Sequence, residues 1–113
     1  MTYTIKQSDE GWIVSDTGGD IAEFMTAPKA QDYAWDHGAT LVIVESESLI
    51  RIYPFGKGNW SEVSVYKPET RYEGKLYPAK VNWSALGACE PEYAKQYAEA
   101  ILKASELAEE LNK

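Results

Sequence analysis

The sequence predicts a single α+β domain that spans residues 1–113 and combines a mostly antiparallel sheet of five to six strands with one short helix and one long C-terminal helix. Three observations predict this fold. Short alternating or β-branched segments between polar turns fill most of residues 2–83, a helical pattern follows the first hairpin, and a small-and-apolar helical stripe ends the chain. A chain of 113 residues has the length of one domain with its own core.

The N-terminal part of the chain is expected to open with a hairpin. Residues 2–7 alternate, with Tyr3 and Ile5 on one side, and residues 8–11 form a polar turn. Residues 12–15 then return as the second strand. After a flexible turn at residues 16–20, residues 21–24 are expected to extend the sheet briefly.

The short helix and the strand after it carry clear boundary signals. Thr26 is suited to the N-cap position, Pro28 stands in the first turn, and Gly38 ends the helix. Residues 39–45 form the most hydrophobic stretch of the chain. We expect this stretch to be a central strand that is buried on both faces.

The remaining elements are a second hairpin, an irregular strand and the long helix. Residues 49–55 and 60–67 are expected to pair around a turn at residues 56–59, and Pro78 places the strand at residues 75–83 at an edge of the sheet. Pro91 occupies the first position of the long helix. The helical stripe expected to face the sheet consists of Ala94, Tyr97, Ala98, Ile101, Leu102, Ser105, Ala108 and Leu111.

Charge divides the chain into three blocks. Residues 1–48 hold two bases and nine acids, a net charge of −7, and residues 84–113 hold three bases and six acids, a net charge of −3. Residues 49–83 hold six bases, three acids and seven aromatic side chains, a net charge of +3. The folded protein should therefore present surfaces of opposite sign, which govern the partners that it attracts.

The first charge block predicts a protein partner. Its acids lie mostly in expected turns and on helix faces, so most should be exposed and should attract a basic surface. A solvated surface that keeps the protein soluble is the alternative interpretation. The residues expected to contact a partner protein are Asp9, Glu10, Asp16, Asp20 and Glu23.

The middle block predicts an alternative partner, single-stranded nucleic acid. If the valines of residues 60–67 face the core, Trp60 and Tyr66 stand on the other face of that strand. The same alternation groups Arg51, Tyr53 and Phe55 on the neighbouring strand, and such a surface stacks bases. If the long helix covers this face instead, these aromatics belong to the core, and the net charge of −7 opposes the binding of polyanions.

The residue types that support catalysis are scarce. His37 is the only histidine, and its position near the end of the short helix suits a contact with the helix carboxyl terminus. Cys89, just before the long helix, is the only cysteine. We expect neither catalysis nor a metal or cofactor; a small enzyme or a ligand-binding cup is the third alternative and would rely on these two residues.

Composition also predicts where the protein works. A single cysteine excludes an internal disulfide and is typical of a reducing compartment. The first residues form no apolar signal segment, and no apolar run is long enough to span a bilayer. We therefore expect a cytoplasmic protein that does not enter the membrane, and homodimerisation remains open.

Two parts of the chain resemble known groups of proteins. Residues 10–56 resemble a family of small bacterial domains of unknown function, which combine a Gly-Trp-x-Val hairpin, an alanine-rich helix and a Gly-x-x-Leu-Val-Ile strand. Residues 81–87 and the helix after them are similar to small uncharacterised phage and prophage proteins, which implies a host-directed binding protein. The residues that match the bacterial family are Gly11-Trp12-Ile13-Val14, Thr26, Ala30, Ala34 and Gly38-Ala39-Thr40-Leu41-Val42-Ile43.

Overall fold

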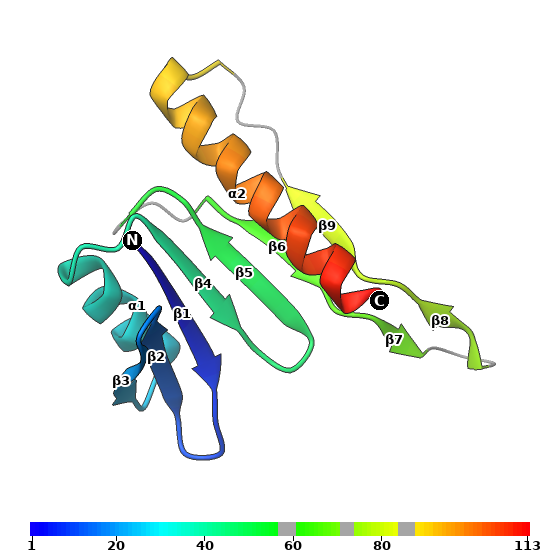
Figure 1. Cartoon of the computed structure of the whole chain (residues 1–113), viewed down its shortest axis with the longest axis horizontal. Coiled ribbons are helices and arrows are strands. Elements are labelled where there is room, and N and C mark those ends of the chain that lie inside the picture. The colour runs from blue at the N-terminus through cyan, green and yellow to red at the C-terminus, as the bar shows by residue number, and fades with distance from the viewer. Residues whose placement is uncertain (57–60, 71–73, 84–87) are drawn as a thin grey trace.

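The computed structural model describes residues 1–56, 61–70, 74–83 and 88–113, and it confirms the α+β class (Figure 1). The described residues form a seven-stranded sheet in the order β3-β2-β1-β4-β5-β6-β9, together with the two-stranded ribbon β7-β8. The strands are β1 Thr2–Gln7, β2 Trp12–Asp16, β3 Gly19–Phe24, β4 Leu41–Glu45, β5 Leu49–Tyr53, β6 Val63–Tyr66, β7 Glu69–Thr70, β8 Leu76–Tyr77 and β9 Lys80–Trp83. The helices are α1 Ala27–Asp36 and α2 Pro91–Leu111.

The sheet is mostly antiparallel, as expected. Only β1 and β4 run parallel among the described pairs, and α1 connects the first three strands to β4. Strand β4 occupies the middle of the sheet with Val42, Ile43 and Val44 buried, which confirms the predicted central strand. The predicted turn at residues 56–59 lies mostly outside the described residues.

The first hairpin depends on a glycine. The backbone N–H of Ser8 donates to the carbonyl oxygen of Gly11 at 2.7 Å, which closes the turn between β1 and β2. A Cβ atom at Gly11 would clash with the carbonyl oxygen of Phe24 on β3. The close approach of the two backbones therefore explains why glycine precedes Trp12 at this point.

Helix α1 packs on the N-terminal half of the sheet. Its N-cap is Thr26, whose side chain accepts a hydrogen bond from the backbone N–H of Lys29, and Pro28 lies in its first turn. Ala30 and Ala34 are fully buried against a core of strands β1, β2, β4 and β5. The predicted start signals, Thr26 and Pro28, are therefore confirmed. At the other end, Gly38 follows the C-cap residue His37 with a φ of 89°, which confirms the predicted end of the helix.

Helix α2 packs on the C-terminal half of the sheet through a stripe that overlaps only in part with the predicted one. Tyr97, Ile101 and Ala108 face the sheet as expected. Ala94, Ala98, Leu102 and Leu111 were also expected to face it, and all four are exposed. The residues that the helix buries are Tyr97, Ala100, Ala104 and Ala108. The small side chains at positions 100, 104 and 108 let the helix approach the sheet closely, and this outweighs the burial of Leu102.

The two helices cover opposite faces of the sheet. On β4, Val42 and Val44 belong to the core under α1, whereas Ile43, which points to the other face, belongs to the core under α2. Each helix covers one half of the sheet, so each face has an uncovered half. The Cα atoms extend over 45 × 40 × 22 Å, and the radius of gyration of 14.7 Å exceeds the ~13 Å of a spherical domain near this size.

The C-terminal end of α2 is attached to the sheet at a break in its last strand. The predicted strand at residues 75–83 is divided into β8 and β9 because Pro78 lacks an N–H and Ala79 pairs elsewhere. Asn112, at the C-cap of α2, accepts the N–H of Ala79 at 2.7 Å and donates to its carbonyl oxygen at 3.2 Å. The asparagine side chain thus takes the place of a neighbouring strand.

Candidate interaction surfaces

The uncovered half of the sheet opposite α2 is formed by β5, β6 and β9. Cross-strand pairing aligns Leu49, Tyr66 and Lys80 in one row on this face. Arg51, Ser64 and Asn82 form the next row. Because Ile50, Val65 and Val81 point to the α2 side, all six side chains lie on the face away from the helix.

One end of this face is occupied by a charged cluster. Arg51 Nε lies 3.4 Å from Glu62 Oε2, an oxygen that is shielded from solvent and forms no hydrogen bond with the described residues. Burial raises the pKa of the neighbouring Tyr53 hydroxyl, and the negative charge of Glu62 raises this pKa further, whereas Arg51 lowers it. Arg51 is therefore already engaged by a carboxylate.

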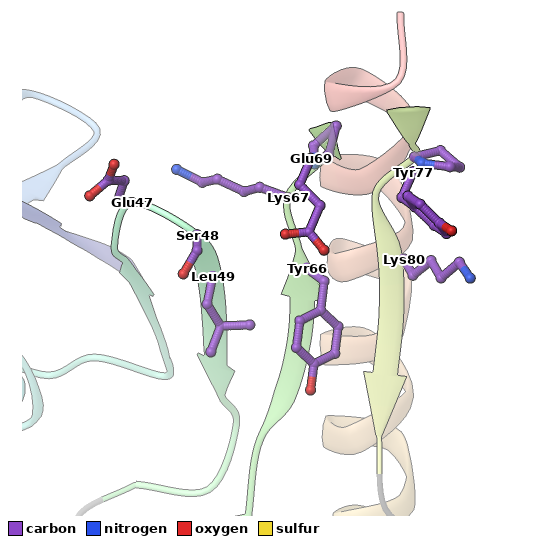
Figure 2. Close-up of a pocket in the computed structure, with 10 residues that line it drawn as sticks. Glu47, Ser48, Leu49, Tyr66, Lys67, Glu69, Tyr77 and Lys80 are labelled. Atoms are coloured by element: carbon purple, nitrogen blue, oxygen red, sulfur yellow. The ribbon is translucent and has the colours of Figure 1, made fainter. Parts of the chain in front are cut away.

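The other end of this face is a groove, which Figure 2 shows with α2 behind the strands. Its volume is about 680 Å³. The floor is the row of Leu49, Tyr66 and Lys80, and Tyr66 is 50% exposed. The groove is also lined by Glu47, Ser48, Lys67, Pro68, Glu69, Tyr77 and Pro78.

The structure changes the candidate nucleic-acid face. Tyr66 and Arg51 lie on the uncovered face, as the alternation of the valines predicted. Tyr53 is only 8% exposed and belongs to the core under α1, so it presents no ring for stacking. Phe55 was expected on the same face, but Pro54 ends the alternation, and Phe55 stacks on Tyr97 of α2 at 5.9 Å between ring centroids. Trp60 lies outside the described residues.

The five predicted acidic residues all lie on the first two hairpins, at the edge of the sheet that β3 forms. Asp9, Glu10, Asp20 and Glu23 are exposed, and Asp16 is half-buried. They form two groups: Asp9 and Glu10 in the β1–β2 turn with Glu23 beside it, and Asp16 and Asp20 at the far end of β2. We call these five residues together with the backbone of β3 the acidic edge.

Two of these acids also close the β2–β3 turn. Asp16 Oδ1 accepts the backbone N–H of Gly18 at 2.7 Å, and Asp20 Oδ1 accepts the Ser15 hydroxyl at 2.6 Å. These contacts use one oxygen of each carboxylate, so the negative charges remain on the surface. Replacement of these residues by asparagine keeps an acceptor and removes the charge.

Strand β3 is itself unusual as an edge. It is six residues long, pairs with β2 on one side, and on its other side pairs with no strand in the described part of the chain. Ile21 is 43% exposed, and Met25, just after the strand, is 81% exposed. Edge strands of natural proteins are usually shortened or protected, whereas this one offers free backbone groups.

The residues considered for catalysis have structural surroundings. His37 Nδ1 lies 2.8 Å from the carbonyl oxygen of Tyr33, and the two rings stack at 3.9 Å, so the histidine contacts the end of α1 as predicted. Cys89 is exposed and does not line the groove. Within the described ranges, no three metal-binding side chains come together.

Sequence reasoning missed the groove. Its floor and walls come from the turn after β4, from β6 and from the β8–β9 break, so Glu47 and Lys80 are 33 positions apart in the chain. No sequence pattern joins such distant residues before the strand order is known. The alternation on residues 60–67 was the one signal, and it located Tyr66.

Comparisons with protein-family models, with curated proteins and with solved structures gave no significant match. The resemblance of residues 10–56 to small bacterial domains therefore stays a prediction, as does that of the C-terminal part to phage proteins, in which residues 84–87 lie outside the described ranges. No helix in the described part of the chain is both long enough and apolar enough to cross a membrane.

Proposed function

We propose that this protein is a non-catalytic protein-binding module whose acidic edge binds a basic, extended segment of a partner protein. The observation that carries this proposal is strand β3, an open edge strand with carboxylates at both ends. The comparisons offer no family from which a function could be transferred.

The backbone of β3 supports binding by strand addition. An added strand gains main-chain hydrogen bonds along the open edge, and alternate side chains contact the surface on either face. Six residues match the usual length of a strand in globular proteins. The exposed side chains of Ile21 and Met25 add apolar surface at the same place.

The charges on the edge select the kind of partner. If a second copy of this chain paired through β3, the carboxylates of Asp20 and Glu23 in one copy would lie close to the same carboxylates in the other. This repulsion disfavours self-association at the edge. Lysine and arginine on an incoming strand would gain from the same carboxylates. The net charge of −7 also steers basic partners toward the protein before contact.

A synthetic strand tests this proposal. The probe is the acetylated and amidated peptide Thr-Lys-Val-Lys-Val-Lys-Thr, titrated into isotope-labelled protein and followed by NMR at about 50 and about 300 mM salt. We expect saturable shifts of the amides of β2 and β3 that weaken at the higher salt. The variant Asp16→Asn, Asp20→Asn, Glu23→Gln should lose most of the affinity.

Two control peptides separate strand addition from simple charge attraction. The same peptide with N-methylated valines keeps its charge but loses backbone donors, and the glutamate counterpart reverses the charge. We expect neither to bind. Equal binding of the N-methylated peptide would contradict strand addition, and no binding of the lysine peptide at about 50 mM salt would contradict the proposed function.

A further inference from the structure

The groove between the start of β5 and the β8–β9 break points to a second binding site, separate from the acidic edge. Strands β2, β1 and β4 lie between β3 and β5, and the groove opens on the face opposite α2. The two sites approach each other only at the β1–β2 and β4–β5 turns, where Asp9 of the acidic edge and Glu47 of the groove line one smaller hollow. A volume of about 680 Å³ is within the range of ligand sites in proteins. We propose that it binds an extended peptide segment that carries a base and an acid on either side of an apolar centre.

The apolar part of the groove would receive the centre of the segment. Leu49 and Tyr66 form the floor (Figure 2), and Pro68 and Pro78 also line the groove. Tyrosine offers an apolar ring for packing and a hydroxyl that donates to a peptide carbonyl. Surfaces of this composition favour leucine, proline or aromatic residues of an extended chain.

Two exposed charged side chains stand at opposite rims of the groove, where they would contact the ends of the segment, and Figure 2 shows both extending outward from the floor. Glu47 lies beside the start of β5 and Lys80 begins β9, and neither has an ion-pair or hydrogen-bond partner among the described residues. Lys67, in contrast, is held by Glu45 at 2.9 Å. The groove therefore presents one available carboxylate and one available ammonium group.

The distance between these charges excludes a small zwitterion. The backbones of Leu49, Tyr66 and Lys80 are aligned across three strands, which span about 10 Å, and Glu47 lies outside this row, two residues before Leu49. A free amino acid carries both charges on neighbouring atoms and cannot reach both sides. A chain of about three or four extended residues spans this width.

The same charges favour a peptide over single-stranded nucleic acid. A nucleic acid is negative along its whole length, so Glu47 and Glu69 would repel it. Arg51, the arginine that the described residues place on this face, is already paired with Glu62. A peptide can place a base against Glu47 and an acid against Lys80.

A selection from random sequences tests the site. The probe is a phage-displayed library of random twelve-residue peptides, selected on the full-length protein and counter-selected on Tyr66→Ala. We expect enriched peptides with a base and an acid on either side of an apolar residue, and about tenfold weaker binding of their synthetic forms to Tyr66→Ala. Tyr93→Ala, which removes a tyrosine of similar exposure on α2 (48% against 50%), should bind normally.

A charge swap sharpens the result. The double variant Glu47→Lys, Lys80→Glu should select peptides in which the order of acid and base is reversed. Urea unfolding of each variant verifies the fold. The proposal is overturned if no peptide distinguishes the wild type from Tyr66→Ala, if the swap leaves the order unchanged, or if oligouridine binds in a Tyr66-dependent manner and displaces the peptides.

Discussion

The two halves of the sheet share one plan and differ in what they leave open. In each half, one helix packs on the sheet through its own alanines. These are Ala30 and Ala34 in α1, and Ala100, Ala104 and Ala108 in α2. The face opposite α1 carries two pairs across β1 and β2, Thr4 with Ser15 and Lys6 with Ile13. The face opposite α2 carries Arg51 and Tyr66 and ends in a groove.

This difference locates the candidate interactions in two separate places. In the N-terminal half, the distinctive feature is the open edge strand with its acids, and the hollow at the β1–β2 turn is smaller than the groove, at about 400 Å³. In the C-terminal half, the distinctive feature is the groove with two charges of opposite sign. One helix per half, on opposite faces, therefore gives a small domain two different surfaces for partners.

The first prediction tests whether the two halves are one cooperative unit. Ile5, under α1, and Ile52, under α2, are both fully buried, and either change to alanine should cost about 2–5 kcal/mol of unfolding free energy. Because β4 contributes to both cores, each variant should keep a single transition in urea, seen equally by tryptophan fluorescence and circular dichroism. Two separate transitions would show that the halves unfold independently.

The second prediction concerns how each helix is attached. Asn112→Ala removes two hydrogen bonds to Ala79 and should cost about 1–3 kcal/mol. Thr26→Ala removes a single long cap bond of α1 and should cost about 1 kcal/mol or less. Asn82→Ala, at an exposed position on β9, is the matched control for the asparagine. Urea midpoints measure all three, and equal losses for Asn112 and Asn82 would contradict the assigned role.

The smallest expected effect concerns the pH dependence of stability at the cluster of Arg51, Tyr53 and Glu62. The pKa of Tyr53 is raised by burial, so its neutral form stabilises the fold fully below the unfolded value of about 10, and this contribution is lost as the pH rises through the folded pKa. The difference in stability between the wild type and Tyr53→Phe should therefore shift in favour of the variant above about pH 10. The exposed Tyr66→Phe serves as control, and an identical pH dependence for both variants would contradict this account.

The sequence predicted where helices and strands begin and end better than it predicted which side of each helix or strand is buried. Thr26, Gly38 and the hydrophobic run of β4 carry their own signals, because capping and burial on both sides depend on nearby residues. The predicted stripe of α2 was right for Tyr97 and Ala108 and wrong for Leu102, which is exposed because the helix packs through alanines instead. Which face a helix covers is decided by tertiary packing.

The candidate sites divide in the same way. The acids of the acidic edge could be named from sequence because turns are exposed by default. The open side of β3 and the groove could not, since both depend on strand order, and the groove joins Glu47 to Lys80 through pairings that only the folded sheet provides.

The most direct test of the account is a competition experiment by NMR on one labelled sample of the protein. The lysine strand peptide and a peptide selected for the groove are added singly and then together, with backbone amide shifts recorded each time. The account predicts that the first shifts β2 and β3, that the second shifts β5, β6 and β9, and that saturation with one leaves the affinity of the other unchanged. Displacement of one peptide by the other, or a shared set of shifted amides, would contradict the claim of two separate surfaces.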